Sequence, residues 1–534
     1  MIDIDVAPRV EVPERFNAAS YFVDRNIEAG RGEKTAIEAG DRTLTYADVA
    51  ASVNRTGNAL RELGLEMEQR VLLALLDCPE FAFSFFGAIK IGAVPVPANT
   101  LLTSDGYRHL LADSRAKVLV VSAELLPVIE PALADAPHLK HVLVVGERPP
   151  STAPIGSAAR PYHVQAFEDL MSGQEAELTP ADTGRDDVAF WLYSSGTTGF
   201  SRAAVHLQHD MVHCVELYAK PVLGINENDR TFSIAKLFFA YGLGNALYFP
   251  FAVGATTILN PGRPDPASVF DVVNKHRPTV FYGVPTAYAQ MLQAVENGAQ
   301  VDMSPVRVAT SAGEALPASV HQRWLDRFGV HILDGIGTTE ILHIFLSNRL
   351  DATRPGSSGR IVPGYEARIV DENGEDVPPG EIGNLMVKGD STCAYYWNQH
   401  ASSKWAIKGE WIRTGDKYHV DEDGYYWYDG RADDMLKAGG IWVSPVEVEA
   451  TIMEHPAVLE CAVVGKPDEE NLTKPKAFVV LKQGPGNEQL ARDIQQFVKQ
   501  RIAPYKYPRW IEFVDELPKT ATGKIQRFKL RQSV

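Results

Sequence analysis

A glycine- and hydroxyl-rich turn directly after an apolar run constrains this chain most. Residues 188–192 (Val-Ala-Phe-Trp-Leu) predict a buried strand, and residues 193–202 continue as Tyr-Ser-Ser-Gly-Thr-Thr-Gly-Phe-Ser-Arg. Glycines let several backbone N–H groups point at one spot, and hydroxyls add donors, so the turn suits a polyanion such as a phosphate chain. It is not a Walker A loop, because the four-residue gap and the Gly-Lys-Ser/Thr ending are missing. An ordinary strand-to-loop turn rich in small residues is the alternative.

The chain around this turn alternates apolar runs of strand length with helical patterns. Thr45 and Asp48 form an acidic variant of a capping box and predict a helix that runs through Leu60. Pro79 predicts the start of another helix, through Ile91. The expected strands are residues 71–76, 118–121, 142–145 and 279–283, with a helix from Pro285 after the last and a loop at 148–161. This alternation predicts parallel sheets covered on both faces, in two similar α/β layers.

From Gly364 the pattern changes to short strands and turns. Residues 367–370 end at the Asn-Gly signal of 373–374, and residues 384–387 are the expected partner strand. With a further β segment at 423–428, a small β-barrel or a distorted sheet is expected. Beyond Gly430 the pattern is α+β, with strands at 458–464 and 477–481 and a helix over 488–502. We therefore predict a domain boundary near 431–434, between an N-terminal domain of residues 1–432 and a C-terminal domain of residues 433–534.

Composition excludes several classes of protein. A chain of 534 residues exceeds one core, and 45% apolar with 22% charged residues is typical of a soluble globular protein. The net charge of -16 argues against binding nucleic acid or an anionic membrane. The four cysteines form no CxxC pair, so buried, reduced thiols are expected. The N-terminus lacks the pattern of a signal peptide, and no apolar stretch reaches the roughly 18 residues of a membrane helix, so a cytoplasmic location is expected.

Five separated motifs together resemble the adenylate-forming superfamily of acyl-CoA synthetases, adenylation domains and luciferases. The motifs are the phosphate turn, Gly-Ile-Gly-Thr-Thr-Glu at 335–340, Arg-Thr-Gly-Asp at 413–416, Gly-Arg-Ala-Asp-Asp at 430–434 and Pro-Lys-Thr-Ala-Thr-Gly-Lys-Ile at 518–525. Each alone has an ordinary structural explanation, but their order and spacing cover most of the chain. The resemblance implies an α/β fold with two α/β subdomains and a small β-barrel in a large N-terminal domain, followed by a small mobile α+β domain.

The resemblance also implies the residues that bind ATP and Mg²⁺. Making a carboxylate attack the α-phosphate of ATP requires neutralisation of charge on the phosphate oxygens and on the attacking group. Glu340 matches the Mg²⁺ contact. Thr339 matches a hydrogen-bond donor to the phosphates, and Lys524 matches the lysine that serves adenylation. The residues expected to bind the nucleotide are Ser194, Ser195, Gly196, Thr197, Thr198, Gly199, Gly313, Glu314, Gly335, Thr338, Asp416 and Arg431. Among them, Asp416 and Arg431 match the ribose contact, and Gly313 and Glu314 match the wall beside adenine.

The second half-reaction is expected on the C-terminal domain. Asp433 matches the hinge about which that domain swings in family members, and Gly439 and Gly440 fall where the family's other face approaches the thiol of coenzyme A. A flexible glycine pair in a loop is the alternative for the last two. The phosphate turn departs from the family pattern, because Ser201-Arg202 replaces the usual Pro-Lys. Arg202 keeps the charge, whereas loss of the proline makes the turn costlier to order around ATP.

The expected acyl slot favours an aromatic acid. Family members that activate amino acids place an aspartate at the position of Ala240, and an ammonium group could not be buried beside alanine cheaply. The slot residues implied by the resemblance are Phe239, Ala240, Tyr241, Ile336, Gly337, Ile341 and His343. A flat slot between aromatic and small residues suits a ring, and the segment 437–445 resembles benzoate–CoA ligases. Core aromatics are the alternative explanation for Phe239 and Tyr241.

We therefore expect an enzyme that joins an aryl acid, most simply benzoate, to CoA with ATP and Mg²⁺, acting alone or as a homodimer. Three other functions remain open: a ligase for another aryl or medium-chain acid, a luciferase-like oxygenase, and a non-catalytic nucleotide-binding protein. The combination of Glu340, Asp416 and Lys524 argues against the last, because a protein that only binds has no need of Lys524.

Overall fold

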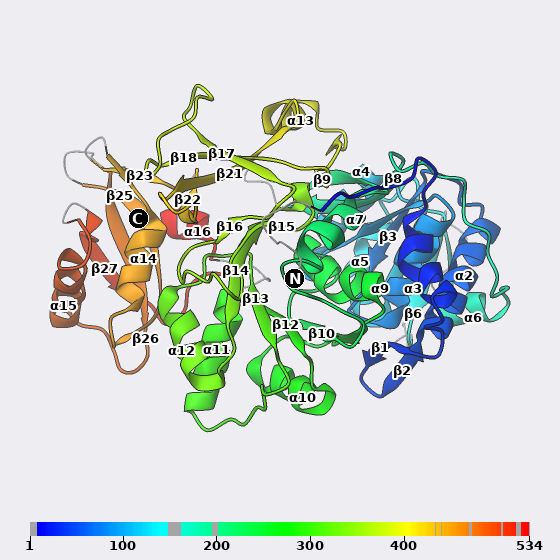
Figure 1. Cartoon of the computed structure of the whole chain (residues 1–534), viewed down its shortest axis with the longest axis horizontal. Coiled ribbons are helices and arrows are strands. Elements are labelled where there is room, and N and C mark those ends of the chain that lie inside the picture. Colours follow the sequence, from blue (N-terminus) through cyan, green and yellow to red (C-terminus); the bar gives the residue numbers. More distant parts are fainter. Residues whose placement is uncertain are drawn as a thin grey trace.

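A computed structural model describes residues 8–147, 162–194, 201–432, 434–438, 441–468, 473–503, 506–519 and 525–532. Figure 1 shows the last elements of the chain gathered at one end of an elongated molecule and the first α/β layer at the opposite end. Between them lie a second, larger sheet and a group of antiparallel strands. The expected α/β class, with a small α+β unit at the C-terminus, is confirmed.

The first layer is a parallel sheet with the strand order β4-β3-β5-β6-β7. Its strands are β3 (Arg70–Ala74), β4 (Val94–Pro97), β5 (Val118–Ser122), β6 (His141–Val145) and β7 (His163–Ala166). Its helices are α3 (Pro79–Lys90), α4 (Ser104–Ser114), α5 (Leu126–Leu133) and α6 (Phe167–Ser172). The runs expected at 118–121 and 142–145 are confirmed as strands, and the run expected at 71–76 forms a strand that ends at Ala74. They are apolar because both faces of the sheet are covered. The loop expected at 148–161 lies outside the described residues.

The second layer is a nine-stranded sheet in the order β16-β15-β14-β13-β12-β10-β11-β1-β2. Its strands are β1 (Thr35–Ala39), β2 (Arg42–Thr45), β10 (Arg230–Ser233), β11 (Thr256–Leu259), β12 (Val280–Gly283), β13 (Val308–Ser311), β14 (Ile332–Gly337), β15 (Ile344–Ser347) and β16 (Arg360–Ile361). The strands from β14 to β1 are parallel, and antiparallel strands close both edges. The helices α10 (Pro266–His276), α11 (Pro285–Glu296) and α12 (Ala318–Phe328) follow β11, β12 and β13.

The core between the layers is rich in aromatic side chains. It includes residues of the short helices α7 (Asp210–Cys214), α8 (Ala240–Leu243) and α9 (Phe249–Val253) and of the long α2 (Tyr46–Glu62). The short α1 (Arg25–Glu28) lies beside it, where Asn26 donates to the carbonyl of Phe251. Phe86 on α3 stacks on Phe251 on α9 at 5.8 Å between ring centroids, and this contact ties the two layers together. The capping box of Thr45 and Asp48 at the start of α2 is confirmed, with both reciprocal hydrogen bonds present.

A three-stranded antiparallel sheet carries the phosphate turn. Its strands are β8 (Val188–Ser194), β9 (Arg202–Leu207) and β19 (Tyr395–Tyr396), in the order β19-β9-β8. Ser194 faces Arg202 across the β8–β9 ladder, so the turn connects two paired strands and its two ends are fixed side by side. The strand expected at 188–192 is confirmed, whereas its antiparallel partner and the contribution of β19 were not expected.

The antiparallel region that follows is a branched sheet. Its strands are β17 (Glu366–Val370), β18 (Gly383–Lys388), β20 (Ile407–Lys408), β21 (Trp411–Val420) and β22 (Tyr426–Arg431), with α13 (His400–Ala406) beside them. Val370 pairs with Asn384, which confirms the expected partner strand. Both β20 and β22 pair with β21, so the distorted sheet is the form that this region adopts.

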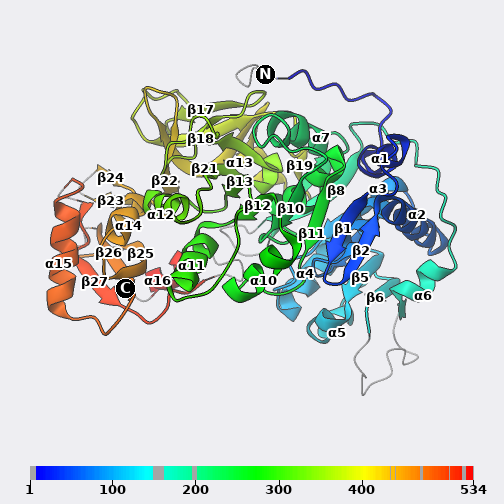
Figure 2. The same ribbon diagram turned by 60° about the horizontal axis from the view of Figure 1, so that its bottom comes forward.

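The C-terminal elements form a separate α+β unit with its own cores, at the left of Figure 1. They are β23 (Leu436–Ala438), β24 (Ile441–Val443), α14 (Pro445–Met453), β25 (Val458–Pro467), β26 (Thr473–Leu481), α15 (Glu488–Lys499), β27 (Trp510–Phe513) and α16 (Arg527–Gln532). Figure 2 shows α14 of this unit beside β22, and the Ser444 hydroxyl donates to the carbonyl of Asp429 there. Arg527 forms a two-pronged ion pair with the buried Glu449, which fixes α16 against α14.

The four cysteines are free, and Cys214, Cys393 and Cys461 are buried. Among the described residues, every helix is too short or too polar to cross a membrane.

Candidate active site

The candidate site is built around Glu340, in a turn that follows the carboxyl end of β14. Thr338 caps the 3₁₀ turn Thr339–Ile341 by accepting a hydrogen bond from the N–H of Ile341 at 3.3 Å. The Oε1 atom of Glu340 accepts from the Ser194 hydroxyl at 3.3 Å and from the Tyr396 hydroxyl at 2.7 Å. The start of the phosphate turn and the expected Mg²⁺ contact therefore lie together, although they are far apart in the sequence.

The backbone of this turn is fixed by donors from another segment. The N–H of Cys393 donates to the carbonyl of Glu340 at 2.7 Å, and the Ser391 hydroxyl donates to the carbonyl of Ile341 at 2.8 Å. Leu342, which follows, has a φ of 71° and is fully buried. A branched residue held in this conformation stores backbone strain, which persists only where the surroundings determine the structure. The turn is therefore held in one conformation.

The C-terminal end of the phosphate turn lies close to Tyr396, the residue that donates to Glu340. The guanidinium of Arg202 lies 4.9 Å from the centre of the Tyr396 ring, and His109 Nε2 lies 3.2 Å from the carbonyl oxygen of Ser201. Burial, together with the charge of Glu340, raises the pKa of Tyr396, so its hydroxyl keeps its proton and donates. Ser195, Gly196, Thr197, Thr198 and Gly199 lie outside the described residues.

Asp416 and Arg431 face each other across the β21–β22 ladder. A nitrogen of Arg431 donates to Asp416 Oδ1 at 2.9 Å, and the Asp416 side chain is 6% exposed whereas that of Arg431 is 42% exposed. The pair expected at the ribose is therefore a preformed ion pair, in which arginine holds the carboxylate in one orientation.

The expected adenine wall follows β13. Gly313 has a φ of 94°, which glycine adopts without steric cost, and Glu314 is next to it. Nearby on β14, just before Gly335, Asp334 accepts from the N–H of Leu316 at 3.4 Å. Burial raises the pKa of Asp334 to about 8, and among the described residues its Oδ1 atom has no hydrogen-bond donor. At neutral pH this carboxyl is therefore mostly protonated and can both donate and accept, which fits the donor and acceptor groups on the edge of adenine. Sequence reasoning missed Asp334.

Two residues of the expected acyl slot, Tyr241 and His343, contact each other directly. His343 Nε2 lies 3.3 Å from the carbonyl oxygen of Tyr241 and 3.1 Å from Asn245 Oδ1, and the rings of Tyr241 and His343 are 5.6 Å apart. Burial lowers the pKa of His343 to about 3, so the ring is neutral at physiological pH. The Tyr241 hydroxyl is 2.6 Å from the hydroxyl of Thr310, a residue that sequence reasoning did not include.

The remaining residues of the expected acyl slot lie on the same segments as this pair or on β14. Ile341 is buried, and Ala240 and Ile336 pack against the same core cluster. A Cβ at Gly337 would approach the carbonyl oxygen of His343 to 2.5 Å, so only glycine lets β14 pass this closely. Phe239 precedes α8, and its ring lies 4.2 Å from the ring of Phe238.

Four expected residues of the C-terminal part cannot be placed. Lys524, the hinge Asp433 and the pair Gly439 and Gly440 lie outside the described residues. The bridge between Lys519 and Ile525 joins the two described residues that flank 520–524.

The donor set around Glu340 fits a magnesium ion that arrives with its nucleotide. The described residues contain no group of three or more carboxylate, histidine or cysteine side chains arranged to hold a metal by themselves. Mg²⁺ usually takes one or two carboxylates, with phosphate oxygens and waters completing its octahedron. Glu340 beside the phosphate turn would be that single protein ligand.

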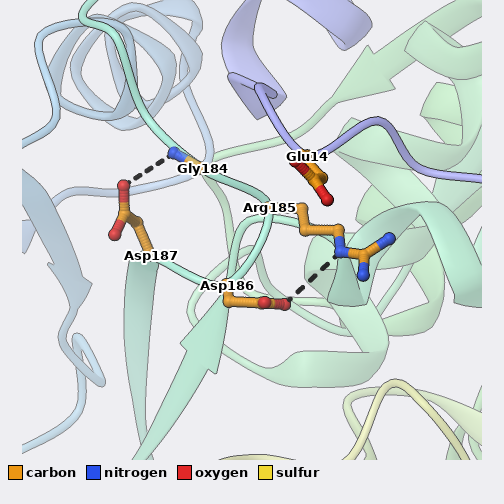
Figure 3. Close-up of a pocket in the computed structure, with 5 residues that line it drawn as sticks. All are labelled: Glu14, Gly184, Arg185, Asp186 and Asp187. Atoms are coloured by element: carbon orange, nitrogen blue, oxygen red, sulfur yellow. Dashed lines mark hydrogen bonds and ion pairs between the residues drawn. The ribbon is translucent and has the colours of Figure 1, made fainter.

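A polar depression of about 300 Å³ lies apart from these residues (Figure 3). Glu14, Gly184, Arg185, Asp186 and Asp187 line it. Polar groups in this lining pair with each other. Asp187 accepts a hydrogen bond from the N–H of Gly184 at 2.7 Å, and Arg185 forms an ion pair with Asp186 at 3.8 Å. None of the residues expected to bind ATP, CoA or the acid lies in its lining.

Comparisons with known proteins agree with this geometry. The family model described as AMP-binding enzyme matches residues 23–397, and the model described as AMP-binding enzyme C-terminal domain matches residues 447–524. The chain is 51% identical over 529 residues to a benzoate–CoA ligase of Thauera aromatica, covering 98% of each chain. Among solved structures, it is similar to the anthranilate CoA ligase AuaEII in complex with anthranoyl-AMP, with a TM-score of 0.92, 46% identity and 98% of each chain covered.

A second solved structure gives the same result. A benzoate CoA ligase from Burkholderia xenovorans LB400 matches with a TM-score of 0.87 and 47% identity, covering 97% of this chain and 100% of that one. The order of motifs, the meeting of Ser194 with Glu340, and the match of both family models lead to one conclusion. The chain belongs to the AMP-binding enzyme family, the adenylate-forming superfamily.

Proposed function

We propose that this chain is an AMP-forming acid–thiol ligase that converts benzoate, ATP and CoA to benzoyl-CoA, AMP and pyrophosphate. The observation that carries this proposal is that a neutral His343 packs against Tyr241 where the acyl slot is expected, with Ala240 at the position that holds an aspartate in amino-acid-activating members. An apolar ring gains free energy by entering such a slot, whereas an ammonium group would lose its hydration without a partner. The full-length similarity to benzoate–CoA ligases supports the same substrate class.

The proposed reaction has two steps. In the first, a carboxylate oxygen of benzoate attacks the α-phosphorus of ATP, the bond to pyrophosphate breaks, and benzoyl-AMP forms. In the second, the CoA thiol loses its proton, its sulfur attacks the acyl carbon, and the bond to AMP breaks. Neither step oxidises or reduces the acid. The protein contributes by holding the reactants in line and by stabilising charge on the phosphate oxygens.

Roles in the first step follow from the arrangement around Glu340. In this proposal Glu340 holds Mg²⁺, with Thr338, Thr339, Ser194 and the phosphate turn binding the phosphate chain. Asp416 accepts from the ribose hydroxyls while Arg431 orients it, and Gly313, Glu314, Asp334 and Gly335 surround adenine. Lys524 neutralises charge as the carboxylate attacks.

The C-terminal domain, beginning at Asp433 in this proposal, serves both steps by turning about that residue. One face presents Lys524 during adenylation, and the other presents Gly439 and Gly440 to the CoA thiol. Both features follow the hinge in the sequence, so one small domain cannot offer both to the same site at once.

The test is product formation from a panel of acids. Benzoate with ATP, Mg²⁺ and CoA should give benzoyl-CoA, AMP and pyrophosphate, measured by chromatography and by pyrophosphate release with and without CoA. The panel includes 2-aminobenzoate, hydroxybenzoates and fatty acids of medium and long chain. Much faster turnover of long-chain acids than of any aryl acid would exclude the aryl slot, and acyl-AMP formation without thioester would exclude the ligase.

We also propose that the enzyme acts in the cytoplasm. The free thiols support an intracellular location. Sedimentation of the purified chain would distinguish a monomer from a homodimer.

A further inference from the structure

A buried histidine lies directly behind the Mg²⁺-binding turn. His206 is on β9, four residues after Arg202, and it is fully buried. Its Nε2 atom lies 2.8 Å from the carbonyl oxygen of Thr339, and its Nδ1 atom lies 2.7 Å from Asp210 Oδ2. Phe190 on β8 stacks on the ring, with centroids 5.1 Å apart and planes 17° from parallel. The imidazole thus has a fixed position and a fixed orientation.

The carbonyl of Thr339 sets the direction of the hydrogen bond at Nε2. A carbonyl oxygen can only accept, so Nε2 carries a proton and donates to Thr339. Asp210 Oδ2 accepts from the N–H of Leu207 at 3.1 Å and is the hydrogen-bond partner of Nδ1. Asp210 is also fully buried, so these two contacts determine its orientation.

A second histidine lies between Asp210 and the surface. His209 Nδ1 lies 3.2 Å from Asp210 Oδ1, and His209 Nε2 lies 3.6 Å from the exposed carboxylate of Asp186. Asp186 is one of the residues that line the depression in Figure 3. Asp210 therefore has a histidine on each side of its carboxyl group.

We propose that His206, oriented by Asp210, is a positioning residue for adenylation. It would hold the carbonyl of Thr339 and thereby aim the carboxylate of Glu340 at the metal of Mg·ATP. The carbonyls of Glu340 and Ile341 are fixed from the segment 391–393, whereas His206 supplies the contact from the strand that leaves the phosphate turn. One strand thus fixes both the end of that turn and the metal-binding turn, so phosphate and metal are placed relative to each other.

This inference rests on the proposed function, and it predicts a loss confined to the first step. Asparagine at this position places its amide nitrogen near Nδ1 and loses the contact with Thr339. Glutamine places its amide nitrogen near Nε2 and can keep that contact. His206→Asn should therefore slow adenylation roughly 10- to 100-fold and raise the Mg²⁺ concentration for half-maximal rate, whereas His206→Gln should retain much more activity. Asp210→Asn should show a smaller loss of the same kind.

The experiment measures each half-reaction separately in purified full-length variants. Benzoate-dependent ATP–pyrophosphate exchange reports adenylation over a Mg²⁺ titration, and preformed benzoyl-AMP with CoA reports thioester formation. The matched control is His276→Gln, because His276 also pairs with a carboxylate, Glu38 at 2.6 Å, but lies on α10. Active-site titration and thermal unfolding correct each rate for folded enzyme.

The outcomes separate the two proposals. If the unmodified enzyme shows no benzoate-dependent exchange, the proposed function fails. If it is active and His206→Asn loses both half-reactions equally, His206 is only structural and the positioning proposal is wrong. Unchanged exchange and unchanged Mg²⁺ dependence in His206→Asn would overturn it as well. If His206→Asn does not fold, the Mg²⁺ dependence of Asp210→Asn decides in the same way.

Discussion

The Tyr396 hydroxyl donates to Oε1 of Glu340 at 2.7 Å, and these two residues come from different sheets. Tyr396 lies on β19, which pairs with β9, whereas Glu340 follows β14 of the nine-stranded sheet. The hydrogen bond uses one carboxylate oxygen and fixes the rotation of the carboxylate. A ligand for a metal ion gains precision when its other interactions are fixed in this way.

Removal of this hydroxyl is the first test of the assignment of Glu340. Tyr396→Phe should raise the concentration of Mg·ATP for half-maximal adenylation and slow that step about tenfold, because a hydrogen bond to a charged group is lost. Steady-state rates at varied Mg·ATP measure the effect. Tyr395→Phe is the control, since Tyr395 is the neighbouring residue and is 39% exposed. Equal effects of the two substitutions would mean that Tyr396 does not belong to the active site.

Asp416 provides a test of the ribose assignment. Asp416→Ala should weaken ATP binding. It should also abolish most of the preference for ATP over 2′,3′-dideoxy-ATP, because the variant has no carboxylate at this position to accept from the ribose hydroxyls. The ratio of the two apparent KM values in the variant and in the parent enzyme is the measurement. Asp421→Asn, which affects a carboxylate paired with Arg354 in the same sheet region, should keep the parent ratio. A preference that survives in Asp416→Ala would place the ribose elsewhere.

Local sequence signals predicted the elements well because their causes are local. The run at 118–121 is apolar on both faces because β5 lies inside a covered sheet, and Thr45 and Asp48 predict the start of α2 through their own hydrogen bonds. Motif order placed Glu340 and Asp416 in a nucleotide site. These predictions need only residues that are neighbours in the chain, or the order of motifs that the family shares.

The contacts that complete the site were not predictable in this way. Tyr396 reaches Glu340 only because β19 pairs with β9 across about 190 residues of chain, and the segment around it has no motif. The roles proposed for His206 and Asp334 likewise depend on contacts with residues of other segments. The pairing of β1 with β11 has the same origin, since no periodicity in a strand specifies which distant strand lies beside it.

The neutral His343 predicts a pH dependence of stability. Its pKa is lowered to about 3 in the folded protein by burial, whereas the unfolded chain has the ordinary value of about 6.5. Between these values the unfolded state binds one more proton than the folded state, so the free energy of unfolding falls as the pH falls. His343→Gln should reduce this dependence by up to about 1.4 kcal/mol per pH unit between about pH 6.5 and pH 3.

Denaturant titrations of His343→Gln and of the parent enzyme from pH 7 to pH 4 measure that difference. His138→Gln removes an exposed histidine and serves as the control. Parallel pH profiles for the parent enzyme and His343→Gln would mean that His343 is hydrated or protonated in the folded protein, and the uncharged acyl slot would lose its main support.

The last prediction separates the two half-reactions through the C-terminal domain. Because Lys524 stabilises charge only while the carboxylate attacks phosphorus, Lys524→Ala should slow adenylation by roughly a hundredfold or more. Supplied with preformed benzoyl-AMP and CoA, the same variant should form thioester at nearly the parent rate. Single-turnover kinetics of each half-reaction measure both effects.

Asp433→Pro should show the opposite pattern. A proline fixes φ at the proposed hinge and would hinder the turn between the two faces, so benzoyl-AMP could form while thioester formation lags. The pair of variants is informative because both positions belong to the same proposed domain, and a general loss of folding would slow both steps in each variant. If Lys524→Ala slowed both half-reactions equally at unchanged folded fraction, a lysine that serves only the first face could not explain it, and the two-face mechanism would not describe this enzyme.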